Sequence, residues 1–369
     1  MALSDNHHYS ILFELIKAGL WESEVRLSLF GDADFSKIYQ MAEEQSVVGL
    51  VTAGLEHVVD VIIQKEDILT FIGGTLQIEQ RNQEMNVFLG KLTEEMREKG
   101  IQSVLIKGQG VAQCYKRPLW RSSGDIDLLL NEEDYEKSKI MLKDAVSNGG
   151  ERIFDKHVGY WLGQWEVELH GALSCGLSFK MERALDKYHK DIVDNGSVRI
   201  WNNGGVIILL PQVDLDIFVL FTHIIKHFYK GGVGVRQICD LCMLLSRFKE
   251  SIDVPDLMNR LQETGLGTEW KVFMAYMVEY LGLPAENAPL YEAKNKWKKK
   301  AAKVQKYILR VGNFGHNRNG IHSKYRLLEL MMGWRRRVRD FAQHWSIFPM
   351  DTMSYFWYIF SGKVVGRFK

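Results

Sequence analysis

Two aspartates downstream of a glycine turn place the tightest restriction on how this chain can fold. Residues 104–106 are a short apolar run typical of a buried strand, and Lys107 and Gly108 follow directly. Further along, Asp125 and Asp127 alternate with apolar residues at the two-residue period of a strand, which turns both carboxylates to one face. Because like charges side by side repel each other unless a cation separates them, this spacing predicts a metal site.

The chemistry of these side chains indicates which metal is expected. Carboxylate oxygens suit Mg²⁺, which commonly combines one or two carboxylates with the phosphate oxygens of a substrate. A glycine turn that opens a helix can bring backbone N–H groups close to such an anion. A second alternating segment, residues 165–170, carries Glu166, Glu168 and His170 on one face. Taken alone, Glu168 is better explained as a solvent-facing strand residue, and only the two aspartates and the resemblance described below favour a functional role.

These motifs together resemble the nucleotidyltransferase superfamily, and more closely a large bacterial family of uncharacterised nucleotidyltransferase-like proteins. That family is marked by a K-G turn, a following Tyr, an Arg shortly before D-I-D-L-L, and a later E-L-H. In this chain the corresponding residues are Lys107, Gly108, Tyr115, Arg121, Asp125, Asp127, Glu168 and His170. The resemblance extends from about residue 95 to about residue 248.

The resemblance implies an Mg²⁺-dependent nucleotidyltransferase that moves a nucleoside monophosphate from an NTP, with ATP expected, to a hydroxyl group of an unknown acceptor. One or two Mg²⁺ ions would be held by the catalytic carboxylates Asp125, Asp127 and Glu168. The expected nucleotide-binding residues are Lys107, Gly108, Gln109, Gly110 and Arg121. The possible acceptor pocket comprises His170, His223, His227, Arg236 and Asp240. For His227 and Asp240 the alternative is a buried ion pair, which would look the same in the sequence.

Other functions are consistent with the same residues. Many active members of the superfamily have a Ser after the motif glycine, where this chain has Gln109. A non-catalytic nucleotide-binding or partner-binding module on the same fold is therefore the main alternative. Three carboxylates argue against it, because buried carboxylates without a metal are costly. A template-independent polymerase acting on RNA ends is a weaker alternative.

The pattern of elements predicts an α+β protein. Residues 100–210 read as alternating strands and helices, and the resemblance implies that they form a mixed β-sheet core with helices of the nucleotidyltransferase type. All-helical regions are expected on either side, in residues 1–99 and 211–369.

Glycines suggest where some of the expected helices end. A helix over residues 65–99 is expected to be interrupted at Gly73 and Gly74. Another, over about 131–147, is expected to end at Gly149 and Gly150. In the helix predicted for residues 213–229, His223 and His227 lie one turn apart on one face. They are interpreted as core or substrate-pocket residues, since the metalloprotease zinc motif is absent.

Charge and cysteine content bear on partners and location. Residues 294–369 contain 18 Lys or Arg against 3 Asp or Glu, a net +15, although the whole chain carries only +1. This basic region indicates either a polyanionic partner or a solvated helix face, and nucleic acid is a less favoured partner. The four cysteines form no disulfide framework, and Cys239 and Cys242 are expected to be buried thiols. With no signal peptide or transmembrane segment apparent, a cytoplasmic protein is expected.

Overall fold

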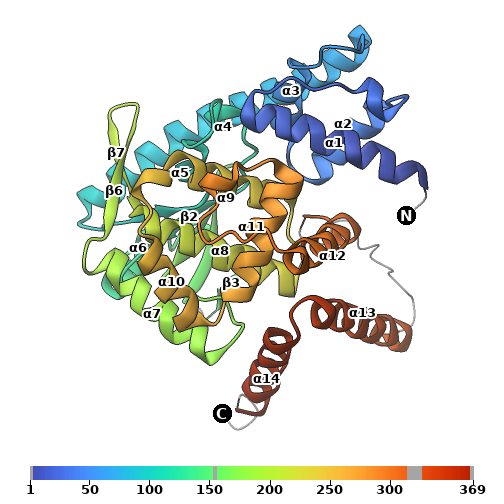
Figure 1. Cartoon of the computed structure of the whole chain (residues 1–369). Helices are drawn as coiled ribbons and strands as arrows, with labels where there is room; N and C mark the ends of the chain where they lie inside the picture. The colour runs from blue at the N-terminus through green and yellow to red at the C-terminus, as the bar shows by residue number, and fades with distance from the viewer. Residues whose placement is uncertain (1–2, 153–155, 314–325, 366–369) are drawn as a thin grey trace.

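The protein is an α+β structure built around one mixed sheet, as the sequence predicted (Figure 1). The computed structural model describes residues 3–152, 156–313 and 326–365. The seven strands have the order β3-β4-β5-β2-β1-β7-β6. Their bounds are β1 Val104–Ile106, β2 Ile126–Leu129, β3 Val146–Arg152, β4 His157–Leu162, β5 Trp165–His170, β6 Val198–Asn203 and β7 Val206–Pro211.

Helices precede, interrupt and follow the sheet. Those before it are α1 Leu3–Trp21, α2 Phe35–Glu44, α3 Val48–Leu55 and α4 Lys65–Glu98. Those between strands are α5 Gly108–Ala112, α6 Glu132–Met141 and α7 Phe179–Val193. Those after it are α8 Val213–Lys230, α9 Val235–Arg247, α10 Val254–Thr264, α11 Gly267–Leu281, α12 Asn295–Val311, α13 Arg326–Ile347 and α14 Pro349–Val365.

Alternation along the central strands divides the sheet into two unlike faces. On one face Ile126 and Leu128 join a core with Met85 and Leu89 of α4. The other face receives Asp127 and Leu129, and Leu129 belongs to a second core that includes the buried residues of α8. Because strand side chains alternate between faces, burying the apolar residues under α4 fixes Asp127 on the α8 side.

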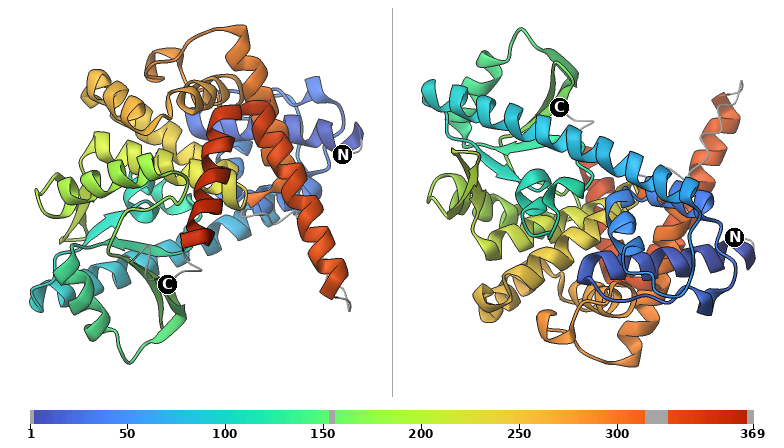
Figure 2. Two further views of the ribbon diagram at one scale, coloured as in Figure 1. Left: turned by 90° about the horizontal axis from the view of Figure 1, so that it is seen from below. Right: turned by 90° about the horizontal axis from the view of Figure 1, so that it is seen from above.

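Helix α4 runs without a break past Gly73 and Gly74, so the predicted interruption was wrong. A glycine inside a helix costs only about 1 kcal/mol relative to Ala. Packing of the helix before and after the glycine pair outweighs that cost. At Gly74 the missing side chain makes room for Tyr39, since a Cβ there would lie 2.3 Å from the Tyr39 hydroxyl oxygen. Figure 2 shows α4 reaching from the N-terminal helices along the sheet.

Helix α6 is shorter than predicted, because it ends at Met141 and the chain enters β3. Gly149 and Gly150 therefore lie within a strand rather than after a helix. Strand β3 pairs with β4, and the register shifts between Asn148 and Arg152. Glycines inside a strand commonly mark such an irregularity. This segment is a strand because it pairs with a neighbouring strand, and the local sequence does not show that partner.

The C-terminal half covers the second face and then extends away from it. Helices α8 and α9 pack over the sheet, while α13 and α14 form a helical pair beyond α12 (Figures 1 and 2). Cys239 and Cys242 are buried free thiols in α9, as expected. Within the described ranges, no helix combines the length and the apolar character that crossing a membrane requires.

Candidate functional site

Three carboxylates meet on the α8 side of the sheet, in the arrangement that the sequence predicted. Strands β2 and β5 are parallel neighbours, and Asp127 pairs directly with Glu168. Asp125 stands just before β2. Carboxylate oxygens of the three residues lie within 4.8 Å of one another. Oxygen ligands at this spacing suit a divalent cation, so the residues present fit Mg²⁺.

Lys107 supplies a positive charge beside the carboxylates. Its Nζ lies 2.8 Å from Asp127 Oδ1, and both side chains are almost fully buried. The Lys107 backbone has φ 60° and ψ −145°, a conformation that non-glycine residues rarely adopt. Such strain costs of order 1–3 kcal/mol and tends to occur at functional sites. The turn therefore places the ammonium group at an energetic cost.

The carboxylates of the cluster carry more negative charge than the ammonium group of Lys107 alone offsets. The charge of Asp127, followed by burial, raises the pKa of Asp125 to about 6. Burial also opposes the charge of Asp127, but Lys107 and His170 hold its pKa below the usual range. The raised pKa of Asp125 shows that a further cation would be favourable at this position.

Two histidines form part of the cluster, and one of them was not predicted. His157 Nε2 lies 2.8 Å from Glu168 Oε2, and His170 Nε2 lies 2.8 Å from Asp127 Oδ1. Although burial opposes the charge of Glu168, hydrogen bonds with the two imidazoles lower its pKa. His157 was missed because its segment lacked a recognised motif.

The glycine turn has the predicted position, but its parts differ in what they offer a nucleotide. Gly108 has φ 44°, which glycine adopts readily. The Gly110 N–H donates to Lys107 O at 3.1 Å, so this amide is used within the turn. The Gln109 side chain is buried, donates to Asn82 and accepts from Ser123. This buried side chain therefore braces the turn, because its amide nitrogen and oxygen both take part in hydrogen bonds within the fold.

Arg121 and Asp240 are engaged with each other rather than with a ligand site. Arg121 donates through Nε and Nη2 to the two Asp240 oxygens, at 2.8 and 2.7 Å. Tyr115 also donates to Asp240, and Arg236 lies 3.9 Å from it. Both members of the pair are less than 5% exposed. The geometry does not support the predicted direct contacts of Arg121 with nucleotide and of Asp240 with acceptor.

Helix α8 brings further polar groups to the site. A cavity of about 40 Å³ is lined by Lys107, His170, His223 and Lys226, among others. Burial lowers the pKa of His223, and burial likewise lowers that of His227 to about 3, so both imidazoles are neutral. Lys226 was not predicted, but it follows His223 by three residues, which places it on the same helix face.

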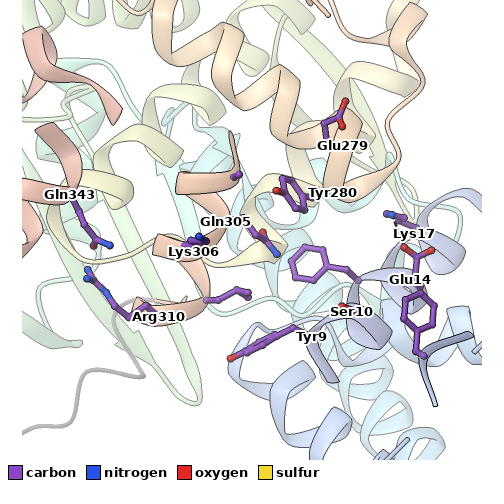
Figure 3. Close-up of a pocket in the computed structure, with 14 residues that line it drawn as sticks. Tyr9, Ser10, Glu14, Lys17, Glu279, Tyr280, Gln305, Lys306, Arg310 and Gln343 are labelled. Carbon is purple, nitrogen blue, oxygen red and sulfur yellow. Dashed lines mark hydrogen bonds and ion pairs between the residues drawn. The ribbon is translucent and has the colours of Figure 1, made fainter. Parts of the chain in front are cut away.

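A larger cleft of about 810 Å³ lies elsewhere, among helices α1, α11, α12 and α13 (Figure 3). Its walls combine aromatic residues such as Tyr9 and Tyr280 with charged residues such as Lys306 and Arg310. All of its lining residues come from helical segments rather than from the sheet. The larger cleft in this protein is therefore not the one beside the carboxylate cluster.

The fold and the cluster define a nucleotidyltransferase-like protein, with a glycine turn beside three carboxylates, two on adjacent strands and one just before the first of them. The chain belongs to the family described as uncharacterised nucleotidyltransferase, which it matches over residues 31–282. This match is wider than the stretch of about 95–248 in which the sequence showed a resemblance. Comparisons with curated proteins and with solved structures found no match.

Proposed function

We propose that the protein is an Mg²⁺-dependent enzyme that transfers a nucleoside monophosphate from an NTP to an acceptor hydroxyl group. The observation that carries this proposal is the convergence of Asp125, Asp127 and Glu168 beside the strained turn at Lys107. Family membership supports nucleotidyl transfer in general. The carboxylate cluster supports the metal, and ATP is the expected nucleotide.

In this reaction the acceptor oxygen forms a bond to the α-phosphorus, and the bond from phosphorus to pyrophosphate breaks. Asp125, Asp127 and Glu168 would hold Mg²⁺, which when bound neutralises phosphate charge and stabilises the attacking and leaving oxygens. Lys107 remains beside Asp127 and adds a positive charge. Glu168 is the candidate to accept the hydroxyl proton or to complete the second metal site.

The other polar groups suggest where each substrate lies. Backbone N–H groups near Gly108 are the proposed contacts of the β- and γ-phosphates. The cavity between β5 and α8, lined by His170, His223 and Lys226, is the proposed acceptor side. The neutral imidazole of His223 there can donate to or accept from a hydroxyl group.

The proposal is tested by measuring pyrophosphate release and transfer of α-labelled nucleotide with each NTP, in Mg²⁺ and in EDTA, across a panel of hydroxyl acceptors. Asp127→Asn and Glu168→Gln should each lower turnover more than about 100-fold, because loss of a residue that only supports a metal ligand costs about 10–100-fold. Glu168→Gln should affect turnover more than nucleotide affinity. The exposed Asp186→Asn serves as the matched control.

A non-catalytic binding module is the alternative, and the buried side chain of Gln109 is the observation that favours it. Such a module would bind Mg²⁺-NTP in a thermal-shift assay, and Asp127→Asn would abolish the shift, yet no acceptor would release pyrophosphate. If wild type and Asp127→Asn bound Mg²⁺-NTP equally well, the site itself would be misassigned.

A further inference from the structure

We propose that His157, Glu168 and His170 form a second metal site, which binds a divalent metal of the zinc class beside the Mg²⁺ site. Ligand atoms of these residues lie within 4.8 Å of one another. Glu168 belongs to this group and to the carboxylate cluster, so the two sites would share one ligand. The metal site stands on its own geometry, whereas its catalytic role rests on the proposed function.

A hairpin builds the site. Strands β4 and β5 are joined by a two-residue loop, in which Gly163 has φ 64°. Two-residue hairpin loops fix the strand register, and here His157 pairs directly with His170 and Gly159 with Glu168. The three ligands therefore share one face of adjacent strands. Gly159, which pairs with Glu168, adds no side chain to this face.

The side chains converge on a single point. His157 Nε2 and His170 Nε2 lie 2.8 and 3.5 Å from the same oxygen, Glu168 Oε2. His170 Nε2 also lies 2.8 Å from Asp127 Oδ1, an oxygen that offers a fourth ligand atom. Without a metal, imidazole N–H groups can donate to these carboxylates. A metal ion would replace those protons and would be coordinated by the lone pairs of the imidazole nitrogens and the carboxylate oxygens.

The ligand types distinguish this site from the carboxylate site. Imidazole nitrogens suit zinc and other transition metals, whereas Mg²⁺ prefers oxygen. Two His and one Glu are a set used for zinc sites that keep one position open for water or substrate. The side chains of His157 and His170 are only 10% and 14% exposed, and that of Glu168 is 24% exposed. The proposed site is thus shielded from solvent at the two histidines and more accessible to solvent at Glu168.

The position of the site suggests what the metal would do. His170 also lines the cavity below α8, which is the proposed acceptor side. A metal ion at this place would bind the acceptor hydroxyl and lower its pKa, while Mg²⁺ on Asp125 and Asp127 binds phosphate oxygens. The hydroxyl proton would pass to water or to a carboxylate.

The experiment uses full-length protein stripped with chelator and titrated with Co²⁺, followed by the visible d–d absorption and by calorimetry with Zn²⁺. Wild type should bind one equivalent with nitrogen-ligand absorption. His157→Gln and His170→Gln should each weaken Co²⁺ binding at least 10-fold, and Asp125→Asn should retain it while losing Mg²⁺. His57→Gln, outside the cluster, is the control.

The wild-type spectrum tests the proposal without a variant, so a folding defect in one variant, checked by circular dichroism, leaves the test intact. Absence of the band, or Zn²⁺ binding that survives both His substitutions, overturns the second site and leaves the imidazoles as hydrogen-bonding residues. Pyrophosphate release in Mg²⁺ alone would then still support the proposed function. Co²⁺ binding without any transfer activity would instead uphold the site and contradict the function.

Discussion

At the scale of single residues, Lys107 shows that local strain serves the carboxylate cluster. Its backbone has a positive φ that favours glycine, yet a glycine there would lack the ammonium group that contacts Asp127. Gly108, with φ 44°, continues the turn. The chain thus has a residue with unfavourable backbone energy at the position where its ammonium group contacts Asp127.

This strain can be measured by comparing Lys107→Ala with Lys107→Gly, since both remove the ammonium group. The glycine variant should be more stable by about 1 kcal/mol, because relief of the positive φ outweighs the greater entropy of glycine in the unfolded chain. Urea denaturation provides the measurement. At Lys99, where φ is −87°, the same pair should show the opposite order. An alanine variant at least as stable as the glycine variant at position 107 would show that the turn is unstrained.

The buried ion pair of Arg121 and Asp240 yields a second prediction, for stability. Burial works against the charge of Asp240, but Arg121 holds its pKa below the usual range. Asp240→Asn should lower the free energy of unfolding by about 3–5 kcal/mol, since it leaves a buried guanidinium without its anion. Asp186→Asn, in an exposed pair with Lys190, should cost less than about 1 kcal/mol.

The pH dependence of the Asp240→Asn effect follows from the lowered pKa. Such a carboxylate stabilises the fold above its unfolded pKa of about 3.9 and loses that contribution as pH falls through its folded value. The difference between wild type and variant should therefore be equal at pH 8 and pH 5, and should shrink only below about pH 4. Chemical denaturation at these values checks it. A difference already reduced at pH 5 would contradict the lowered pKa.

At the scale of elements, helices α1 and α3 cross with their backbones in close contact. A Cβ at Gly54 would lie 2.0 Å from Leu15 O, and a Cβ at Gly19 would lie 2.0 Å from Leu50 O. Glycine is required on both helices because the atoms that it faces are backbone atoms, which cannot move aside as a side chain can. Two glycines thus set the distance between these helices.

Gly54→Ala should therefore destabilise the protein by about 3 kcal/mol or more, because the added methyl group overpacks against backbone. Gly73→Ala in α4 is the matched control, since a Cβ there meets no atom within 4 Å. It should stabilise the protein by up to about 1 kcal/mol through helix propensity. Thermal denaturation followed by circular dichroism compares the two. A Gly54 variant as stable as wild type would show that the helices can move apart at little cost.

At the scale of the whole molecule, α4 joins the N-terminal helices to the sheet. Phe71 belongs to the core shared with α1–α3, whereas Met85 and Leu89 belong to the core beneath the sheet. Hydrogen bonds strengthen the second contact, including Arg97 Nη2 to Ile207 O at 2.7 Å. We propose that residues 1–99 brace the catalytic region rather than fold apart from it.

If so, Leu89→Ala should lower the free energy of unfolding by about 2–5 kcal/mol and shift one common transition. Tryptophan fluorescence and far-ultraviolet circular dichroism should give the same midpoint, because a helix present in both cores couples them. Phe71→Ala, at the other end of α4, should shift the same transition. Two separate transitions in either variant would show that the regions unfold independently.

The basic C-terminal segment is partly neutralised inside the fold. Lys298 pairs with Glu279, Lys294 with Glu292, and Arg310 lies 3.2 Å from Asp340. These contacts support the interpretation of a packed helical region with a basic outer face. They account for part of its charge without a polyanionic partner.

The sequence by itself determined the class of fold and the face of the sheet on which the carboxylates lie. Strand periodicity turned Asp127 and Glu168 away from the apolar residues that flank them, and burial of those residues required that orientation. The glycine turn at Gly108 was equally readable, because it depends on local backbone conformation. These features follow from interactions between residues close in sequence, which a single chain displays directly.

Only the tertiary structure decided which long-range partners each side chain found. Arg121 binds Asp240, which is 119 positions away, and Gln109 binds Asn82, which is 27 positions away. Their places in the motif predicted contacts with a ligand, but in the fold both side chains bind other residues of the protein. The strand at Gly149 formed because β4 was there to pair with it. His157 reached Glu168 through the hairpin register. Local pattern cannot specify such partners, because their energies depend on which surfaces the completed fold brings together.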